Sequence, residues 1–168
     1  IARAEQLTAE LVAENPAIIY IPLELLNKVD LTPYVGKTKF CAVLPRIFRT
    51  KDEPYFRQVL QKTEGLSAVA VGNLGHLPIV AGLGLEIRGD FGMNVFNSRT
   101  LSFMKDHGFA AATVSFELRH QQVRDLRKYI PCEAIVYGRL PLMVTENCPT
   151  GNAGNCRGDK RLCEGENY

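Results

Sequence analysis

Hydrophobic residues along the chain fall into short continuous runs that alternate with segments of helical spacing. Several runs are rich in β-branched residues and end at proline or glycine, which is typical of strands buried on both faces of a sheet. Between them, apolar residues recur every three or four positions, which predicts amphipathic helices. The predicted strands cover residues 17–21, 39–44, 67–71, 85–88, 112–116 and 133–137. The predicted helices cover residues 2–14, 53–62, 76–82, 98–107 and 119–129.

This alternation predicts an α/β fold whose parallel strands are joined by right-handed crossovers. No G-x-G-x-x-G fingerprint follows the first strand, which weakens a dinucleotide-binding interpretation. About six strands are fewer than a closed β/α barrel needs, so we expect a partial (β/α) barrel, a fragment of a TIM-barrel-like domain. An open doubly wound sheet is the alternative. We expect the partial barrel to span residues 1–146 and a cysteine-containing segment to span residues 147–168.

Composition narrows the class of protein. The 168 residues are 46% hydrophobic and 23% charged with a net charge of +2, which is ordinary for a globular domain and predicts no polyanion partner. No apolar run approaches the roughly 20 residues that span a bilayer. The chain begins at Ile1 inside a helical pattern, so we expect a fragment of a longer protein. Three of its five cysteines are clustered, which favours a reducing compartment, and we expect a cytoplasmic location.

Polar residues follow nearly every predicted strand. In parallel α/β folds the carboxyl ends of the strands carry the functional residues, so these side chains could line one mouth. Some of them also suit helix caps or loops. The strand-end residues are Arg46, Asn73, His76, Asp90, Asn94, Asn97, Glu117, Arg139, Glu146 and Asn147.

Three of these residues are candidates for acid–base chemistry. Glu117 directly follows an apolar strand, where a carboxylate can act as a general acid or base or can bind a substrate amine. Asp90 follows Gly89, which permits a sharp exit from the strand. His76 could transfer protons or bind a metal, but a hydrogen-bonded loop histidine is equally common. Neither a G-x-S-x-G nor an H-E-x-x-H motif occurs, so the motifs support neither a serine hydrolase nor a zincin.

The three clustered cysteines form a candidate metal site. Cys148, Cys156 and Cys163 lie in a segment rich in Gly, Asn and Asp, and their spacing is looser than that of zinc ribbons. Soft thiolate ligands on such a loop suit a 4Fe–4S cluster, a structural zinc ion, or no metal at all. The other two, Cys41 and Cys132, lie in or beside apolar strands and are expected to be inert.

Five motifs occur in order along the chain, and together they resemble a known family. They are Gly72-Asn73-Leu74-Gly75-His76, Arg88-Gly89-Asp90-Phe91, Asn94-Val95-Phe96-Asn97-Ser98, Ser115-Phe116-Glu117-Leu118 and Tyr137-Gly138-Arg139-Leu140-Pro141-Leu142-Met143. The chain resembles the collagenase-like peptidases, family thirty-two of the peptidases of unknown catalytic type. The Gly-Arg-x-Pro-Leu-Met element, followed by a cysteine, is the most specific part. The closest resemblance is to the later part of the catalytic unit in long bacterial members.

The resemblance implies a β/α-barrel-like fold with a cysteine site after the last of these strands. The name of the family comes from members reported to degrade collagen. Other relatives perform prephenate-dependent or oxygen-independent hydroxylation of RNA bases or ubiquinone precursors, with cysteines that hold a 4Fe–4S cluster. Cys148, Cys156 and Cys163 would match part of that ligand set.

Three functional interpretations stay open. In a peptidase, Asp90, Glu117 and His76 would polarise water or hold a metal. A non-catalytic scaffold would bind peptide or RNA across the same mouth. In a hydroxylase-like enzyme the three clustered cysteines would carry the cluster, and an anionic RNA or small-molecule substrate would be held by Arg88, Asn94, Asn97 and Arg139. The expected partners are therefore a substrate, the missing N-terminal barrel strands, or a second copy at the open sheet edges.

Overall fold

A computed structural model describes residues 1–141 of the chain. Residues Ile1–Val136 form one compact unit, and a second unit begins at Tyr137. The first unit contains a sheet of six strands in the order β1-β2-β3-β4-β5-β6, and every neighbouring pair is parallel. The strands are β1 (Ile18–Pro22), β2 (Lys39–Val43), β3 (Leu66–Val71), β4 (Glu86–Gly89), β5 (Ala111–Thr113) and β6 (Cys132–Glu133).

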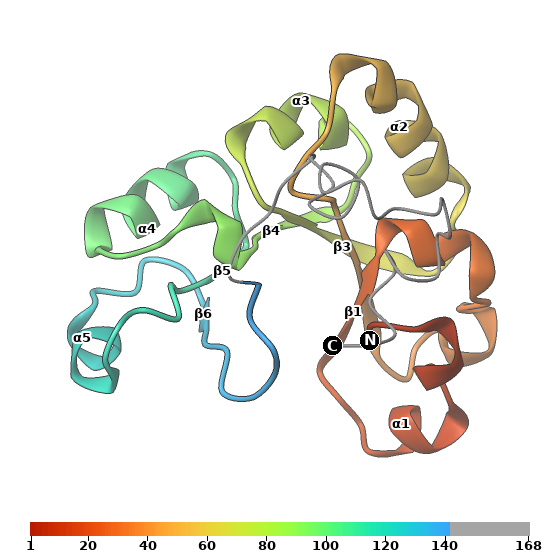
Figure 1. The fold of residues 1–168 in the computed structure, drawn as a ribbon, viewed down its shortest axis with the longest axis horizontal. Helices are drawn as coiled ribbons and strands as arrows, with labels where there is room; N and C mark the ends of the chain where they lie inside the picture. The colour runs from red at the N-terminus through yellow and green to blue at the C-terminus, as the bar shows by residue number, and fades with distance from the viewer. Residues whose placement is uncertain (142–168) are drawn as a thin grey trace, which may run out of the picture. The chain divides into compact units, whose positions relative to one another are not determined.

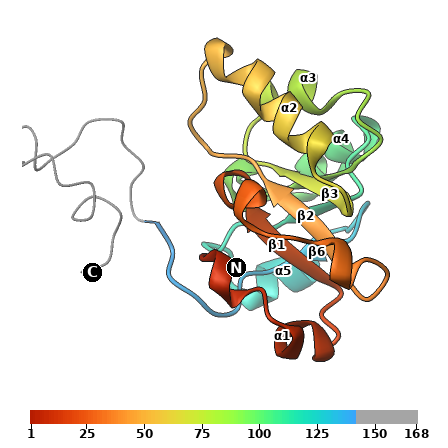
Figure 2. The ribbon, with the colours of Figure 1, turned by 90° about the vertical axis from the view of Figure 1, so that its right-hand side faces the viewer.

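The sheet curls into a half barrel with helices between successive strands. Figure 1 shows the helices in an arc outside the strands, and Figure 2 shows β1, β2 and β3 side by side. Because each strand pairs with the next one in sequence, the arrangement is that of a β/α barrel rather than a doubly wound sheet. The predicted partial barrel is confirmed. The predicted domain boundary between residues 146 and 147 lies outside the described residues.

Short helices connect the strands. The α-helices are α1 (Ala9–Ala13), α2 (Glu53–Lys62), α3 (Leu77–Val80), α4 (Ser98–Asp106) and α5 (His120–Asp125). The 3₁₀ helices are η1 (Ala4–Gln6), η2 (Leu23–Lys28), η3 (Thr32–Tyr34), η4 (Thr50–Asp52), η5 (Leu74–His76) and η6 (Phe91–Met93). The bounds of α2 and of most strands lie within a residue of those that the hydrophobic pattern predicts.

Several elements are shorter than predicted, among them α3, β5 and the three described next. The helix predicted over residues 2–14 is divided, since Thr8 is extended and caps α1 by accepting a hydrogen bond from the Leu11 N–H at 3.2 Å. Helix α5 ends at Asp125 rather than near residue 129, and the Lys128 ammonium donates to three carbonyls at that end. After β6 the chain leaves the ladder, and Val136 is 92% exposed.

The two faces of the sheet are packed differently because alternate residues of a strand point to opposite sides. Phe40 and Ala42 of β2 belong to the large apolar cluster that includes the buried residues of the helices. Cys41, between them, packs on the other face with Ala68 and Ala70 of β3. The middle of this inner face therefore carries small side chains, which leaves room for longer polar ones from the other strands. Burial raises the pKa of the Cys41 thiol, as expected of an inert core cysteine.

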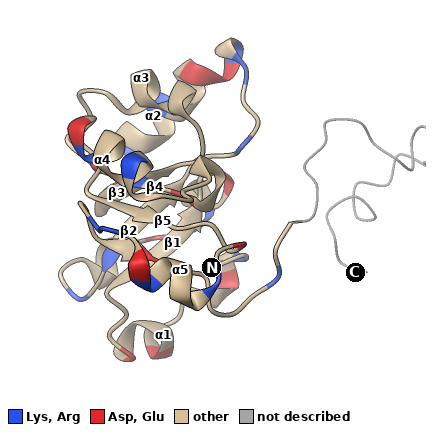
Figure 3. Ribbon diagram, turned by 90° about the vertical axis from the view of Figure 1, so that its left-hand side faces the viewer, with Lys and Arg blue, Asp and Glu red and all other residues tan. Residues whose placement is uncertain are grey.

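Charged residues of both signs are interspersed over the elements visible in Figure 3. None of the helices in the described part of the chain is long and apolar enough to cross a membrane.

The sheet has two open edges, at β1 and β6, with no further described strand beside either. Unpaired edges expose backbone donors and acceptors that favour pairing with another strand. We predict that the purified chain associates with a second copy of itself. Light scattering across a range of concentrations should give a mass above that of the 18.7 kDa chain. A stable monomer at every concentration would contradict this prediction.

Candidate active site

A polar network crosses the inner face of the half barrel. The Tyr20 hydroxyl of β1 donates a hydrogen bond to the Glu133 carboxylate of β6 at 2.5 Å and accepts one from the Arg88 Nε of β4 at 2.9 Å. The Arg88 guanidinium also pairs with Glu133 and with Glu86. Because β1 and β6 are the edge strands, this contact joins the two ends of the curled sheet through side chains.

The charges of this network are balanced. Arg88, with a side chain only 14% exposed, lies between Glu86 and Glu133, and Lys39 pairs with Glu86 at 3.3 Å. Burial alone would raise the pKa of Glu86, but hydrogen bonds from Arg88 and Lys39 outweigh it and lower that pKa. Burial and the hydrogen bond to the Glu133 carboxylate raise the pKa of the Tyr20 hydroxyl. The network thus holds two cations and two carboxylates around a neutral tyrosine.

A cavity of about 460 Å³ opens beside this network. It is lined by Tyr20, Asp90, Thr113, Glu133, Ala134 and Ile135. Asp90 directly follows β4, and its N–H continues the ladder by donating to the Val71 carbonyl at 2.9 Å. Burial raises the pKa of the Asp90 carboxyl, which the Phe91 N–H and the positive charge of Arg46 only partly offset. Two carboxylates, Asp90 and Glu133, therefore line one cavity in different surroundings.

The loops that follow β2, β3, β4 and β5 pack against one another. A β-carbon on Gly92 would lie 2.7 Å from the Gly72 carbonyl oxygen, so only glycine fits at residue 92 without a shift of the backbone. The Arg46 guanidinium carbon lies 5.3 Å from the centre of the Phe91 ring, and that ring lies 6.1 Å from the ring of Phe116. Four strand ends are thereby joined into one rim beside the cavity.

Comparison with protein families identifies the chain. A model described as peptidase family U32 matches residues 25–163, from within η2 through β2–β6 and beyond. The chain belongs to this family. The resemblance seen in the sequence motifs is therefore confirmed. Comparison with curated proteins gave no match, and comparison with solved structures gave none.

His76 of this U32 member lies away from solvent, with none of its surface exposed. Its Nδ1 accepts a hydrogen bond from the Gly72 N–H at 3.2 Å, and its ring lies 4.8 Å from that of Phe48. Burial lowers the pKa of the imidazole. These contacts are those of a neutral histidine that holds the loop after β3, which is the alternative role considered from the sequence.

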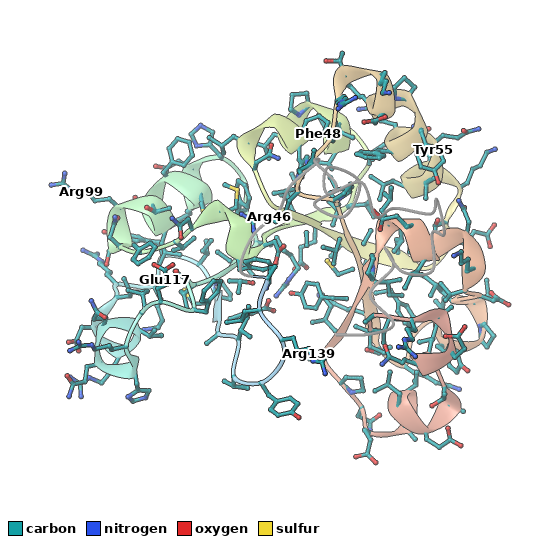
Figure 4. The ribbon with its side chains drawn as sticks, in the orientation of Figure 1. Arg46, Phe48, Tyr55, Arg99, Glu117 and Arg139 are labelled. Carbon is teal, nitrogen blue, oxygen red and sulfur yellow. The ribbon has the colours of Figure 1, made fainter. Side chains whose placement is uncertain are left out.

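The other predicted site residues lie outside the cavity lining. Glu117 is exposed after β5 (Figure 4), and its N–H donates to the Ser115 hydroxyl at 3.3 Å. Asn97 caps α4 by accepting a hydrogen bond from the Thr100 N–H at 3.0 Å. Asn94 is exposed and ends η6 with a left-handed backbone. Arg139 belongs to the second unit.

Of the predicted residues, the structure brings Asp90 and Arg88 to the inner face of the half barrel. The sequence prediction did not include Tyr20, Glu86 or Glu133. A signal was available, because Glu86, Arg88 and Asp90 alternate with Ile87 and Gly89 along one strand. Charges at alternate positions of a strand that is otherwise buried must meet partners on the same face.

The described side chains offer no cluster of metal ligands. No group of three or more His, Cys, Asp or Glu residues among them could hold a metal ion. Cys148, Cys156 and Cys163 lie outside the described residues, so their role as ligands stays a prediction.

The Tyr20→Phe substitution should reduce the free energy of unfolding by about 1–3 kcal/mol, because Arg88 and Glu133 each lose a hydrogen-bond partner in a partly buried site. Urea denaturation of both proteins measures the difference. The matched control is Tyr55→Phe, since Tyr55 is 48% exposed and accepts only a 3.4 Å hydrogen bond from Asn27. That control should change stability by less than about 0.5 kcal/mol. Equal effects of the two substitutions would show that the network adds nothing to stability.

Proposed function

We propose that this U32 family member hydrolyses peptide bonds in the cavity at the carboxyl ends of β4, β5 and β6, with Asp90 as the acid–base residue. The observation that carries the proposal is that two carboxylates, Asp90 and Glu133, line the same cavity. Glu133 is held by Arg88 and Tyr20, whereas Asp90 has no side-chain cation within ion-pair distance among residues 1–141. Carboxylates in such unequal surroundings suit separate roles in proton transfer.

Asp90 would act first as a base and then as an acid. Its carboxylate accepts a proton from a water molecule as the water oxygen attacks the peptide carbonyl carbon. The same proton then passes to the leaving nitrogen as the C–N bond breaks, which yields a carboxyl and an amine. A carboxyl group whose pKa is raised by burial is better matched to both transfers than an ordinary aspartate is.

The surrounding residues would position the reactants. The negative charge of Glu133 contributes to the raised pKa of Asp90, and Arg88 keeps Glu133 in place. Each nitrogen atom of Arg88 already has an acceptor, so we assign it to positioning rather than to substrate binding. Glu117, exposed after β5, is suited to binding a substrate amine near the cavity. His76 supports the site by holding the loop after β3.

The Asp90→Asn variant should lose about 100-fold or more in kcat/KM for peptide hydrolysis, since proton transfer by a positioned carboxylate contributes on this order. A quenched fluorescent peptide library identifies a cleaved substrate, and the variant is then assayed on it. The exposed Asp106 of α4 supplies the matched control, and Asp106→Asn should keep full activity. Full activity of Asp90→Asn, or loss only in Glu117→Gln, would contradict the role of Asp90.

The pH dependence gives a second readout of the same variant. Because the base must be ionised, the acid limb of kcat/KM should lie above the ordinary aspartate range of about pH 4.

The raised pKa of Asp90 also affects stability. The pKa of this carboxyl is higher in the folded protein than in the unfolded chain, so the stability that it contributes is present below the unfolded pKa and is lost as the pH rises through the folded pKa. At pH 7 the ionised Asp90 therefore costs stability, and Asp90→Asn should unfold at the same or a higher temperature. An inactive variant with a lower unfolding temperature would point to damage of the fold.

The cysteine spacing favours a second function. Cys148, Cys156 and Cys163 would supply three of the four ligands that a 4Fe–4S cluster or a structural zinc ion takes. With a cluster, the same mouth would serve iron–sulfur-dependent hydroxylation of RNA bases or quinone precursors. The cluster would supply redox chemistry, and this chain would bind and orient the substrate.

Metal analysis separates the two functions. Protein purified without oxygen should contain iron and sulfide, with absorbance near about 400 nm, if the cysteines hold a cluster. Cys148→Ser should then lose iron, sulfide and absorbance together, whereas Cys41→Ser at a buried position should keep them. Zinc alone, or no metal in the unmodified protein, would contradict the cluster.

A further inference from the structure

Arg46 is an exposed cation three residues after β2, and its guanidinium makes no ion pair with a side chain of residues 1–141. None of the salt bridges or side-chain hydrogen bonds within residues 1–141 involves that group. Instead, its terminal carbon lies over the Phe91 ring at 5.3 Å. An aromatic face attracts a guanidinium but leaves its N–H donors unused. The donors of Arg46 are thus held in place and open to an acceptor from outside the described chain.

The surroundings of Arg46 keep it beside the cavity. Its backbone carbonyl accepts a hydrogen bond from the Asn73 side chain at 3.3 Å. A β-carbon on Gly92 would lie 3.4 Å from the Arg46 Nε, so the loop after Asp90 passes directly beside the guanidinium. A β-carbon on Gly72 would lie 3.6 Å from the Arg46 Cγ. The loops after β3 and β4 therefore both lie against the arginine side chain.

An apolar surface adjoins this cation. Phe91, under the guanidinium, contacts Phe116 after β5, with ring centres 6.1 Å apart. Phe116 is 40% exposed, so the ring that adjoins Phe91 is open to solvent. The rim therefore offers a forked donor and an aromatic ring side by side, which suits a carboxylate attached to an apolar group.

We propose that Arg46 binds a carboxylate of the peptide substrate and selects peptides that carry one next to the bond cleaved at Asp90. The guanidinium fork matches a carboxylate with two parallel hydrogen bonds, and Phe116 packs against the neighbouring apolar part of the peptide. The carboxylate can belong to the peptide C-terminus or to an acidic side chain. This proposal rests on the proposed peptidase function, because it names the substrate class of the same site.

Binding of labelled peptides tests the proposal without a need for turnover. Three peptides with an N-terminal fluorophore share one sequence and end in a free carboxylate, in an amide, or in an amide with an internal glutamate. Fluorescence anisotropy should show that at least one carboxylate peptide binds about tenfold or more tightly than the neutral amide. Arg46→Gln should abolish this preference. Arg99→Gln should retain it, since the exposed Arg99 of α4 projects away from Arg46 in Figure 4.

The other possible results either identify the source of the carboxylate or overturn the proposal. The peptide that shows the preference identifies the source of the carboxylate. Equal binding of all three peptides, or a preference that survives Arg46→Gln, would overturn the proposal. A short RNA that binds more tightly than every peptide and depends on Arg46 would also overturn it. Repeating the titrations with Asp90→Asn separates the two proposals, because carboxylate preference can persist even if Asp90 proves to have no part in cleavage.

Discussion

The hydrogen bond between Tyr20 and Glu133 is the contact on which the shape of the half barrel depends. It joins two residues 113 positions apart in the chain, on strands at opposite edges of the sheet. A six-stranded sheet that curls without closing has no backbone ladder to fix its two edges relative to each other. Here Arg88 fixes them, because its nitrogens reach both Glu133 and the Tyr20 hydroxyl. Desolvation offsets much of the energy of such a pair, so its main contribution is geometric: it sets the distance across the inner face.

This constraint explains why one strand can supply several kinds of charge. Glu86, Arg88 and Asp90 lie on the same face of β4 and its extension, since side chains two positions apart point the same way. The first two are neutralised inside the network, by Lys39 and Glu133. Asp90 lies one position past the strand, at the cavity, and has only the Phe91 N–H and the more distant Arg46 charge to offset burial. Of the two carboxyl groups that line the cavity, Glu133 is therefore paired with Arg88 and Tyr20, whereas Asp90 is not part of the network.

The hydrophobic pattern was enough to predict the elements, their order and the partial barrel, because each depends on local periodicity and short connections. It also located Asp90, since a strand end is a local feature. The hydrophobic pattern could not predict the contact between Tyr20 and Glu133, because that contact follows from the curvature of the whole sheet. His76 shows the same limit: its sequence fits an acid–base group, and only its contacts with Gly72 and Phe48 reveal the buried loop histidine. The helical pattern also favoured a longer α5, but the backbone is extended at Leu126 and Lys128 donates to the carbonyls at that end.

Each nitrogen of the Arg88 guanidinium already has an acceptor, and this limits where a negatively charged group of a substrate could bind. Arg88 was the natural candidate from the sequence, but its three nitrogens are occupied by Tyr20, Glu86 and Glu133. If Arg88 bound a substrate instead, Glu86 would keep only Lys39 as a partner and Glu133 only Tyr20. Arg46 has no such role, and its stacking on Phe91 already removes part of its rotational freedom. An arginine that is held in place binds an anion with less loss of entropy than a free one does. Arg46 would serve either reaction, because an anionic substrate of a hydroxylase-like enzyme would meet the same exposed guanidinium as the carboxylate of a peptide.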